Sequence, residues 1–259
     1  MKAIYFSLAL CLAVMSLSCQ SNSHASELPW TKGKLLFEDD GTQDWQANWM
    51  LDGQRSQVIN SEQGMELIAG PEAKNDTCHS VLWTQQSFEG NICIEYDYTR
   101  TDTATRYVNI IYFHTTGEGS EEYPSDIALW NDKRVVPHMR TYFHNMRTYH
   151  ISYATSTPER DYIRLRRYNP ELKRLKGTDI KEDHFETGLF QKDVSYHVQV
   201  FKFAEQVEMH IQNNSKQSDR LICKWDVSAL PTYENGRIGL RHMYTRSARY
   251  QNFKVWSLK

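Results

Sequence analysis

The sequence predicts an all-β fold, a two-sheet antiparallel sandwich of the jelly-roll type. First, many short runs alternate apolar and polar residues with a period of two, as strands do when one face is buried. Second, Val, Ile, Tyr, Phe and Thr dominate these runs, and turn-forming stretches separate them. Third, helical periodicity is missing apart from a turn near residues 123–130, so the strands must pack on one another. The predicted strands are 65–68, 80–85, 91–100, 107–114, 149–154, 162–168, 195–203, 207–212, 221–226, 237–243 and 250–258.

The first residues of the chain have the features of an export signal. Lys2 supplies a positive charge, and residues 4–17 form an apolar run of the length expected for the core of a signal peptide. This run is shorter than the ~20 residues that a transmembrane helix needs. We therefore expect residues 1–18 to be a signal peptide.

The cleavage point has two alternatives. Ser16-Leu17-Ser18-Cys19 resembles a lipoprotein box, after which Cys19 would be acylated and residues 19–28 would form a polar tether. Residues 23–25 instead offer a small-x-small site for release as a soluble protein. The sequence thus predicts an exported protein, either an outer-membrane or cell-surface lipoprotein or a periplasmic protein.

Residues 29–259 form one jelly-roll domain in this interpretation. Leu35 to Phe37 are the expected first strand, and segments 236–242 and 247–256 are the expected closing hairpin. The first and last strands of a jelly roll commonly pair within one sheet, so we expect these two ends of the domain side by side. The net charge of −2 excludes a generally basic protein that coats nucleic acid.

The domain contains three cysteines, Cys78, Cys93 and Cys223. Because the number is odd, at most one disulfide forms and one thiol remains. Their spacing fits no zinc motif, so the prediction is that they are buried as small apolar side chains.

Two C-terminal stretches resemble a known group of folds. Gly-Arg-Ile-Gly-Leu-Arg at 236–241, followed by Ser-Ala-Arg-Tyr-Gln-Asn-Phe-Lys-Val-Trp at 247–256, is similar to the C-terminal signature of concanavalin A-like, laminin-G-like jelly rolls. Such jelly rolls occur in bacterial carbohydrate-active proteins, including the 3-keto-disaccharide hydrolase group. Segments 94–102, 152–154 and 161–168 resemble one poorly characterised bacterial family of this fold. The resemblance implies the fold, whereas lyases, hydrolases and pure binders all use it.

The strongest clue to function is a local charge bias. Residues 133–158 contain no aspartate or glutamate. A strip with cations, imidazoles and phenols but no acid suits an anionic, hydroxyl-rich ligand such as a uronic-acid polysaccharide, because the planar fork of arginine binds a carboxylate at two points. The strip holds Lys133, Arg134, His138, Arg140, His144, Arg147 and His150, interleaved with Tyr142, Phe143, Tyr149 and Tyr153.

Strand alternation predicts which of these side chains share a face. His150 lies on one face of its strand, while Tyr149 and Tyr153 lie on the other. In the next strand, Arg164 and Arg166 share the face opposite to the apolar side chains. We expect these arginines on an outer or concave surface, with tyrosine rings beside them.

The main hypothesis is a polysaccharide lyase that cleaves an anionic glycan by β-elimination. A cation on the carboxylate stabilises the enolate-like charge that forms when the C5 proton leaves. Histidine titrates near neutrality, so it can act as base or acid. The residue types are similar to those of jelly-roll alginate and heparin lyases. In this hypothesis the proton is moved by His144 or His150, together with Tyr149 or Tyr153. The carboxylate is bound by Arg140, Arg164 and Arg166, and Asn109 or Asn145 helps to neutralise it. The groove and its rim are completed by His114, Trp130 and His242.

Two alternatives to the lyase remain. Glu95 and Asp97 are two residues apart on a predicted strand, so their carboxylates share a face about 7 Å apart. This arrangement suggests a glycoside hydrolase, or an enzyme that cleaves 3-keto-glycosides, that uses the two acids and a histidine. Laminarinase-type jelly-roll hydrolases have a second glutamate in Glu-x-Asp-x-x-Glu, whereas this chain continues with Tyr98-Thr99-Arg100. The other alternative is a non-catalytic carbohydrate-binding module.

No cofactor is expected. Asp126, Asn131 and Asp132 form no proper calcium loop, and the histidines lack the i, i+4 spacing of zinc enzymes. Structural calcium, which is common in this fold, stays an open alternative. Glycine-rich phosphate loops and the Gly-x-Ser-x-Gly elbow are missing. The expected partner is a polysaccharide or oligosaccharide. No nucleic-acid partner is expected, and contact with a membrane is expected only through the lipid anchor.

Overall fold

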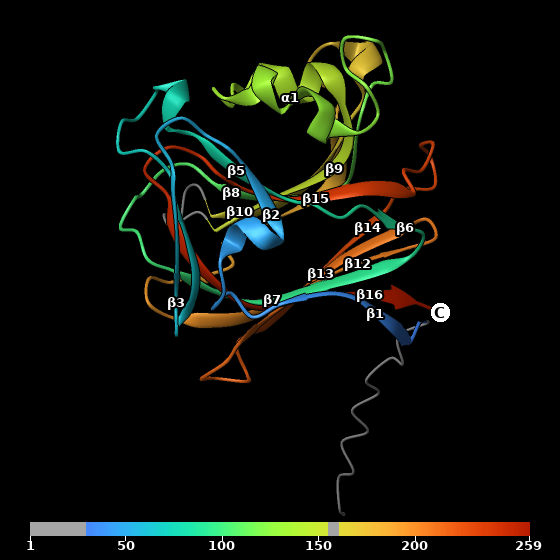
Figure 1. Ribbon diagram of the computed structural model, residues 1–259. Helices are drawn as coiled ribbons and strands as arrows, with labels where there is room; N and C mark the ends of the chain where they lie inside the picture. The colour runs from blue at the N-terminus through green and yellow to red at the C-terminus, as the bar shows by residue number, and fades with distance from the viewer. Residues whose placement is uncertain (1–29, 155–160) are drawn as a thin grey trace, which may run out of the picture.

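The computed structural model describes residues 30–154 and 161–259. The predicted signal peptide, the lipidation site Cys19 and the tether up to residue 28 lie outside the described residues. Within them, the strands form two eight-stranded antiparallel sheets that pack face to face (Figure 1). No helix of the described chain is long and apolar enough to cross a membrane.

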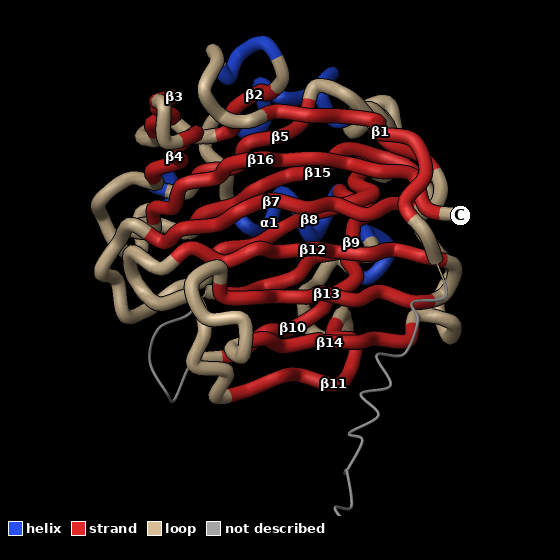
Figure 2. The backbone as a smooth tube through the Cα atoms, turned by 90° about the horizontal axis from the view of Figure 1, so that it is seen from below, coloured by secondary structure: helices blue, strands red, loops and turns tan. Residues whose placement is uncertain are grey.

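One sheet, called sheet A, has the strand order β14-β13-β12-β7-β16-β4-β3, and β1 pairs with β16 beside this path. Figure 2 views the molecule from the side of sheet A, with β1, β16, β7, β12, β13 and β14 stacked across the picture. Its strands are β1 (Lys32–Asp39), β3 (Gln57–Ser61), β4 (Gly64–Ile68), β7 (Ile92–Arg100), β12 (Ser195–Phe203), β13 (Gln206–Asn213), β14 (Arg220–Asp226) and β16 (Ser247–Leu258).

The other sheet, sheet B, has the order β11-β10-β9-β8-β15-β5-β2, and the short β6 pairs with β15. Its strands are β2 (Trp49–Asp52), β5 (Ser80–Thr84), β6 (Phe88–Glu89), β8 (Asn109–Gly117), β9 (Met146–Tyr153), β10 (Tyr162–Tyr168), β11 (Asp179–Phe185) and β15 (Asn235–His242). Short helical turns lie in the connections: η1 (Trp45–Ala47), η2 (Asp76–Cys78), η3 (Ile127–Arg134), α1 (Met139–Asn145) and η5 (Pro170–Leu172).

The two ends of the domain pair as the sequence predicts. In the antiparallel pair of β1 and β16, Leu35 lies opposite Trp256 and Phe37 lies opposite Val255. The prediction that the first and last strands of a jelly roll share one sheet is confirmed.

Alternation along the strands separates the interior from the outer faces. In β7, Ile94, Tyr96 and Tyr98 are fully buried between the sheets, and the residues between them face outward on sheet A. In β10, Ile163 and Leu165 are buried in the same core. Each large apolar side chain buried in this way contributes roughly 1.5–3 kcal/mol to the stability of the fold. The period of two in the sequence therefore corresponds to strands whose alternate side chains are buried between the two sheets.

One segment between β8 and β9 departs from the all-β prediction. Residues 118–145, called the covering segment, include η3 and α1 and lie across the outer face of sheet B (Figure 1). Trp130 and Tyr142 of this segment pack against Trp83 and Tyr112 of the sheet in a second, smaller core. The strip predicted over residues 133–158 is therefore split, because its first part belongs to the covering segment and only its second part is a strand.

Asp52 fixes the covering segment to the sheet. Its fully buried carboxylate accepts hydrogen bonds from Arg134 Nε (2.7 Å), Asn131 Nδ2 (2.5 Å) and the Tyr142 hydroxyl (2.7 Å). Trp83 Nε1 donates a fourth hydrogen bond from β5 (2.8 Å). A buried charge pair is costly to break, because removal of one partner leaves an uncompensated charge.

The three cysteines of the domain are buried with free thiols. Burial raises the pKa of Cys93 and of Cys223 to about 12, so both thiols are protonated at neutral pH. The prediction that the cysteines are small buried side chains is confirmed.

Candidate functional site

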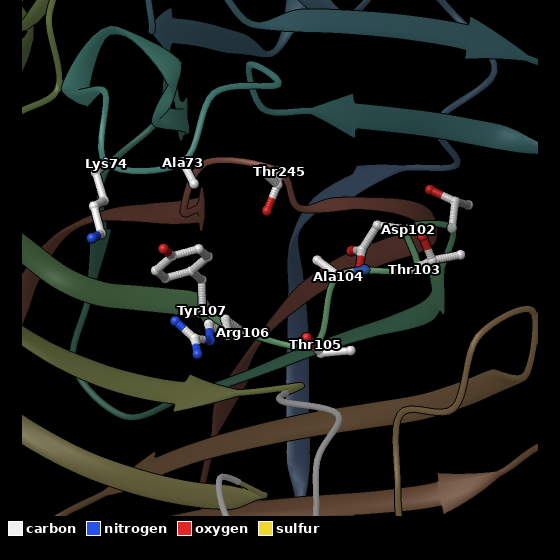
Figure 3. A pocket seen from close by; sticks show the side chains of 10 residues that line it. Ala73, Lys74, Asp102, Thr103, Ala104, Thr105, Arg106, Tyr107 and Thr245 are labelled. Carbon is white, nitrogen blue, oxygen red and sulfur yellow. The ribbon is translucent and has the colours of Figure 1, made fainter.

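One end of the sandwich has an open pocket between three loops (Figure 3). The loops join β4 to β5, β7 to β8 and β15 to β16, and each crosses from one sheet to the other. The pocket has a volume of about 720 Å³, within the roughly 300–1,000 Å³ that small-ligand sites occupy. We call it the end pocket, and its lining residues are Ala73, Lys74, Thr101, Asp102, Thr103, Ala104, Thr105, Arg106, Tyr107 and Thr245.

Asp102 holds two of these loops together. One carboxylate oxygen accepts hydrogen bonds from Arg100 Nε (3.1 Å) and from the backbone N–H of Ala104 (2.9 Å). The other oxygen accepts from the backbone N–H of Ser247 (2.9 Å) and lies 3.1 Å from Arg246 Nε. The side chains of both arginines are buried. A single buried acid thus joins the β7–β8 loop to the β15–β16 loop.

Three lining residues hold a backbone conformation that side chains disfavour. Lys74, Tyr107 and Thr245 have φ angles of 66°, 70° and 67°, in the left-handed region where residues other than glycine are uncommon. The Tyr107 ring packs edge-on against Tyr244, with 4.3 Å between the centroids, and Thr245 N donates to Gly70 O (2.8 Å). Backbone strain of this kind, of order 1–3 kcal/mol for each residue, concentrates at functional sites.

The side chains of the end pocket offer hydroxyls, cations and one phenol ring. Figure 3 shows Lys74, Arg106 and Tyr107 on one side of the pocket and Thr103 on the other, with the Thr245 hydroxyl directed into the space between them. Within the described part of the chain, neither Lys74 nor Arg106 forms an ion pair with a carboxylate. Such a set can hold a polar ligand through hydrogen bonds, contact with an aromatic face, and charge.

The sequence matches one family model over residues 35–255, which is described as a domain of unknown function, DUF1961. The chain belongs to the DUF1961 family. No curated protein matches its sequence.

Solved structures share the fold of this DUF1961 protein at low sequence identity. A protein of unknown function with a galectin-like fold from Bacillus subtilis matches with a TM-score of 0.68 and 17% identity, covering 88% of this chain and 98% of that one. Basic winged bean lectin, solved with Tn-antigen, matches with a TM-score of 0.55 and 8% identity, covering 87% and 99%. A legume lectin-like domain from Entamoeba histolytica matches with a TM-score of 0.54 and 10% identity, covering 85% and 96%. The predicted concanavalin A-like jelly roll is confirmed, while the relation to 3-keto-disaccharide hydrolases and polysaccharide lyases stays a prediction.

Part of the predicted cationic surface does gather in this DUF1961 protein, on the outer face of sheet B. Arg166 lies opposite His150 in the register of β10 and β9, and Arg164 lies opposite Ser152. His150 is buried, and its two ring nitrogens contact the hydroxyls of Tyr168 (2.5 Å) and Ser152 (2.6 Å). Burial, followed by the charges of nearby arginines, holds the pKa of His150 well below its ordinary value. The imidazole is therefore neutral, with both nitrogens engaged inside the protein.

Arg164 and Arg166 are paired with acids of the neighbouring strand β11. Arg164 donates from Nε (2.8 Å) and Nη2 (2.5 Å) to the carboxylate of Asp183. Arg166 Nη2 lies 2.8 Å from the carboxylate of Asp179. The prediction missed these partners because β11 was not among the expected strands. Arginines that already bind carboxylates of their own chain are less available to a carboxylate on a ligand.

The predicted partnership of His150 with Tyr149 or Tyr153 is wrong in geometry. The two tyrosines lie on the opposite face of β9, fully buried between the sheets. The Tyr153 hydroxyl accepts a hydrogen bond from the hydroxyl of Tyr96 (3.1 Å), and burial raises the pKa of Tyr153 to about 12. Because the backbone of the sheet separates the phenols from the imidazole, they cannot share a proton on a ligand.

Three further residues expected in the groove are inside the sandwich. Asn109 Nδ2 donates to the Tyr98 hydroxyl (2.7 Å), and His242 Nε2 contacts the Tyr250 hydroxyl (2.8 Å). Burial lowers the pKa of His242 to about 3 and that of His114 to about 4. These side chains stabilise the interior and do not line a surface.

The other expected groove residues belong to the covering segment. Trp130 is buried and donates from Nε1 to the carbonyl of Pro124 (3.0 Å). Asn145 is buried as well, while His144 is half-buried and Arg140 is exposed on α1. The covering segment shields the outer face of sheet B, so these residues do not form one groove with the strands below them.

Glu95, one of the alternative catalytic acids, faces outward on sheet A, on the other side of the sandwich. It accepts hydrogen bonds from Trp256 Nε1 (2.6 Å) and Gln199 Nε2 (3.1 Å) and pairs with Lys32. Burial would raise its pKa, but these donors outweigh burial and keep the pKa of Glu95 below its ordinary value. Glu95 is therefore ionised at neutral pH.

The histidine that lies beside Glu95 and Asp97 is His197. His197 Nδ1 lies 3.0 Å from Asp97 Oδ1, and its Nε2 lies 3.8 Å from Glu95 Oε2. Burial opposes ionisation of Asp97, yet hydrogen bonds from His197, Asn252 (2.8 Å) and Asn214 (3.3 Å) keep its pKa below the ordinary value. Glycoside hydrolysis needs one protonated acid, which two ionised carboxylates cannot supply. The geometry thus favours an ion-pair network over a hydrolase site.

The sequence prediction missed the end pocket, although one signal was present. Residues 101–105 hold three threonines and Asp102 between two predicted strands, and loops on a rigid scaffold often carry function. The other lining residues come from loops that are distant in the sequence and meet only in the folded chain. In the described residues, no group of His, Cys, Asp and Glu is arranged to hold a metal ion.

Proposed function

We propose that this protein binds carbohydrate in the end pocket and does not cleave it. The observation that carries the proposal is the composition of the pocket, in which the Tyr107 ring lies beside Lys74 and Arg106 and threonine hydroxyls line the remaining sides. A sugar presents one apolar face and several hydroxyls, so an aromatic ring with hydrogen-bonding groups around it matches both features.

The fold supports this proposal. Winged bean lectin, which shares the jelly-roll architecture, was solved with Tn-antigen. The end pocket is also formed by loops on a rigid two-sheet scaffold, an arrangement in which loops vary while the sandwich keeps its shape.

The accessibility of the surfaces points to the same location. The covering segment closes the outer face of sheet B, and the Arg134 side chain that holds it to Asp52 is fully buried. His150 beneath the segment is buried, whereas Arg164 and Arg166 are partly exposed but already bind Asp183 and Asp179. The end pocket is open without any rearrangement.

Binding is favoured over lyase chemistry because three of the four expected proton carriers have no access to a ligand, and the fourth, His144, lies on α1, apart from both tyrosines. A general base must lie within hydrogen-bond reach of the proton that it removes. His150 is buried under the covering segment, and Tyr149 and Tyr153 are buried between the sheets. The uronic-acid lyase of the sequence hypothesis would therefore need other residues.

Substitution of Tyr107 tests the proposal. The full chain is incubated with a panel of immobilised neutral and anionic polysaccharides, and the retained fraction is measured. We expect Tyr107→Ala to weaken binding at least 10-fold, equivalent to about 1.4 kcal/mol, and Tyr107→Phe to retain most of it because the ring remains. Phe185→Ala is the matched control, since Phe185 is a 62% exposed aromatic residue outside the pocket.

Two results would contradict this proposal. One is a wild-type chain that no polysaccharide of the panel retains. The other is binding that Tyr107→Ala leaves unchanged. An increase in ultraviolet absorbance from an unsaturated product during the incubations would support the lyase instead.

A further inference from the structure

We infer that the end pocket selects an anionic sugar over a neutral one, with Lys74 and Arg106 as the pair that binds the acidic substituent. This inference rests on the proposed function and names the class of its ligand. The acidic substituent can be a carboxylate or a sulfate, since both present several oxygens to a guanidinium and an ammonium group.

The acid inside the end pocket does not oppose an anionic ligand. Asp102 contacts two buried arginines, Arg100 at 3.1 Å and Arg246 at 3.1 Å, whose side chains are 5% and 0% exposed. One negative charge is thus set against two positive charges at the base of the pocket. The Asp102 carboxylate is also saturated by the backbone N–H groups of Ala104 and Ser247.

The remaining acids near the pocket are directed elsewhere. Glu66 accepts a hydrogen bond from the hydroxyl of Thr101 (2.6 Å), at the edge of the lining. Asp76, two residues after Lys74, lies 3.2 Å from the ring nitrogens of both His79 and His138. The acids of these loops therefore have partners of their own, and Lys74 is left without one among the described residues.

Lys74 and Arg106 differ in this respect from Arg164 and Arg166, two cations that were candidates for ligand binding. Arg164 and Arg166 bind Asp183 and Asp179, as described above. Lys74 and Arg106 are exposed, line a pocket, and have no carboxylate partner in the described chain. A ligand that brings its own negative charge would gain charge-assisted hydrogen bonds here without first breaking an ion pair.

The inference is tested with matched pairs of polysaccharides and the full chain. Polygalacturonate is compared with its methyl ester, which has the same backbone without the charge, and dextran sulfate is compared with dextran. Binding is measured by affinity electrophoresis and calorimetry at low and at physiological salt. We expect the charged member of at least one pair to bind at least 10-fold more tightly than its neutral partner, with affinity that falls as salt rises.

Two single substitutions locate the effect. Arg106→Gln and Lys74→Gln should each reduce affinity for the charged member about 10-fold and weaken the salt dependence. Arg174→Gln and Lys176→Gln are matched controls, because both residues are exposed cations of another loop. They should leave affinity unchanged. The pair that responds, polygalacturonate or dextran sulfate, identifies the substituent as a carboxylate or a sulfate.

The outcomes separate this inference from the proposed function. Equal binding of charged and neutral members, with loss of both in Tyr107→Ala, would overturn the inference and leave carbohydrate binding intact. Binding of the charged members that neither Arg106→Gln nor Lys74→Gln alters would also overturn it. Failure of every member of both pairs, together with the wider panel, would contradict both.

Discussion

At the scale of single residues, the end pocket depends on Asp102. Its carboxylate is the shared partner of Arg100 and Arg246, and it fixes two backbone N–H groups of different loops. Lys74, Tyr107 and Thr245 can hold their left-handed conformations only while the surrounding loops are held in place. The shape of the pocket is thus determined by charges beneath it as much as by the side chains that line it.

Asp102→Asn should destabilise the protein although the shape of the side chain is kept. The substitution leaves Arg100 and Arg246 buried without a negative partner, and the expected cost is about 3–5 kcal/mol. Urea unfolding followed by tryptophan fluorescence measures this change. Asp132→Asn, at an exposed acid, is the control and should alter stability by less than about 0.5 kcal/mol. An unchanged midpoint in Asp102→Asn would show that the buried arginines do not need this carboxylate.

The sequence of one strand shows which side chains share a face, but not what covers that face. Alternation predicted that His150 and Tyr149 lie on opposite faces of one strand, and the structure agrees. The pattern could not reveal that both faces are covered, one by the other sheet and one by residues 118–145. Burial of the second face is a tertiary property, so the chemistry assigned to His150 could not be judged from its own strand.

At the scale of elements, the covering segment decides which surface is available. It contains only two short helices, and neither is long enough to show helical periodicity in the sequence. The acidic edge strand β11 was missed for a related reason. Its sequence, DIKEDHF, lacks regular apolar alternation because a strand at a sheet edge has little surface to bury. Strands with regular alternation were predictable, including the edge strand β14, whereas β11 and the covering segment were not.

Asp52→Ala should release the covering segment. The substitution removes the acceptor for Arg134, Asn131, Tyr142 and Trp83 and leaves a buried guanidinium unpaired. We expect a loss of stability of about 3–5 kcal/mol and faster tryptic cleavage within residues 118–145. Limited proteolysis with mass spectrometry identifies the cut sites. Glu72→Ala, at a partly exposed acid that pairs with Arg55, is the control. Equal cleavage rates in both variants would mean that Asp52 does not anchor the segment.

At the scale of the whole molecule, the sandwich buries several neutral histidines. Burial is the main cause that lowers the pKa of His79 to about 2, of His242 to about 3 and of His114 to about 4, and that of His150 well below its ordinary value. In the unfolded chain each histidine would titrate near pH 6.5. Protonation therefore favours the unfolded state.

The free energy of unfolding should fall as the pH drops below about 6.5. Folded-state pKa values below the unfolded value mean that the stabilisation is fully present above pH 6.5 and is lost toward pH 4, at roughly 1 kcal/mol per pH unit for each histidine. Unfolding in guanidinium chloride at pH 7.5, 6 and 5 measures the slope. His114→Gln should reduce the proton uptake on unfolding by about one. Constant stability from pH 7.5 to 5 would contradict the buried, neutral state of these side chains.

The fold as a whole could be predicted from the sequence, because alternation and turn residues are local signals. The pairing of the terminal strands joins distant residues and was expected only because jelly rolls commonly pair them. The end pocket could not, because Lys74, Arg106 and Thr245 come from three loops that meet only after the two sheets have packed. Charge bias in one stretch of sequence pointed to residues 133–158, whereas the two cations that line the end pocket are single residues in separate loops.

In the proposed function, a glycan binds between the loops at the end of the sandwich. Hydrogen–deuterium exchange of the full chain, with and without the polysaccharide that it retains, tests this most directly. We expect slower exchange on binding in residues 101–108 and 243–246, with little change in strand β10. Protection confined to β10 and the covering segment, or to the outer face of sheet A, would contradict it.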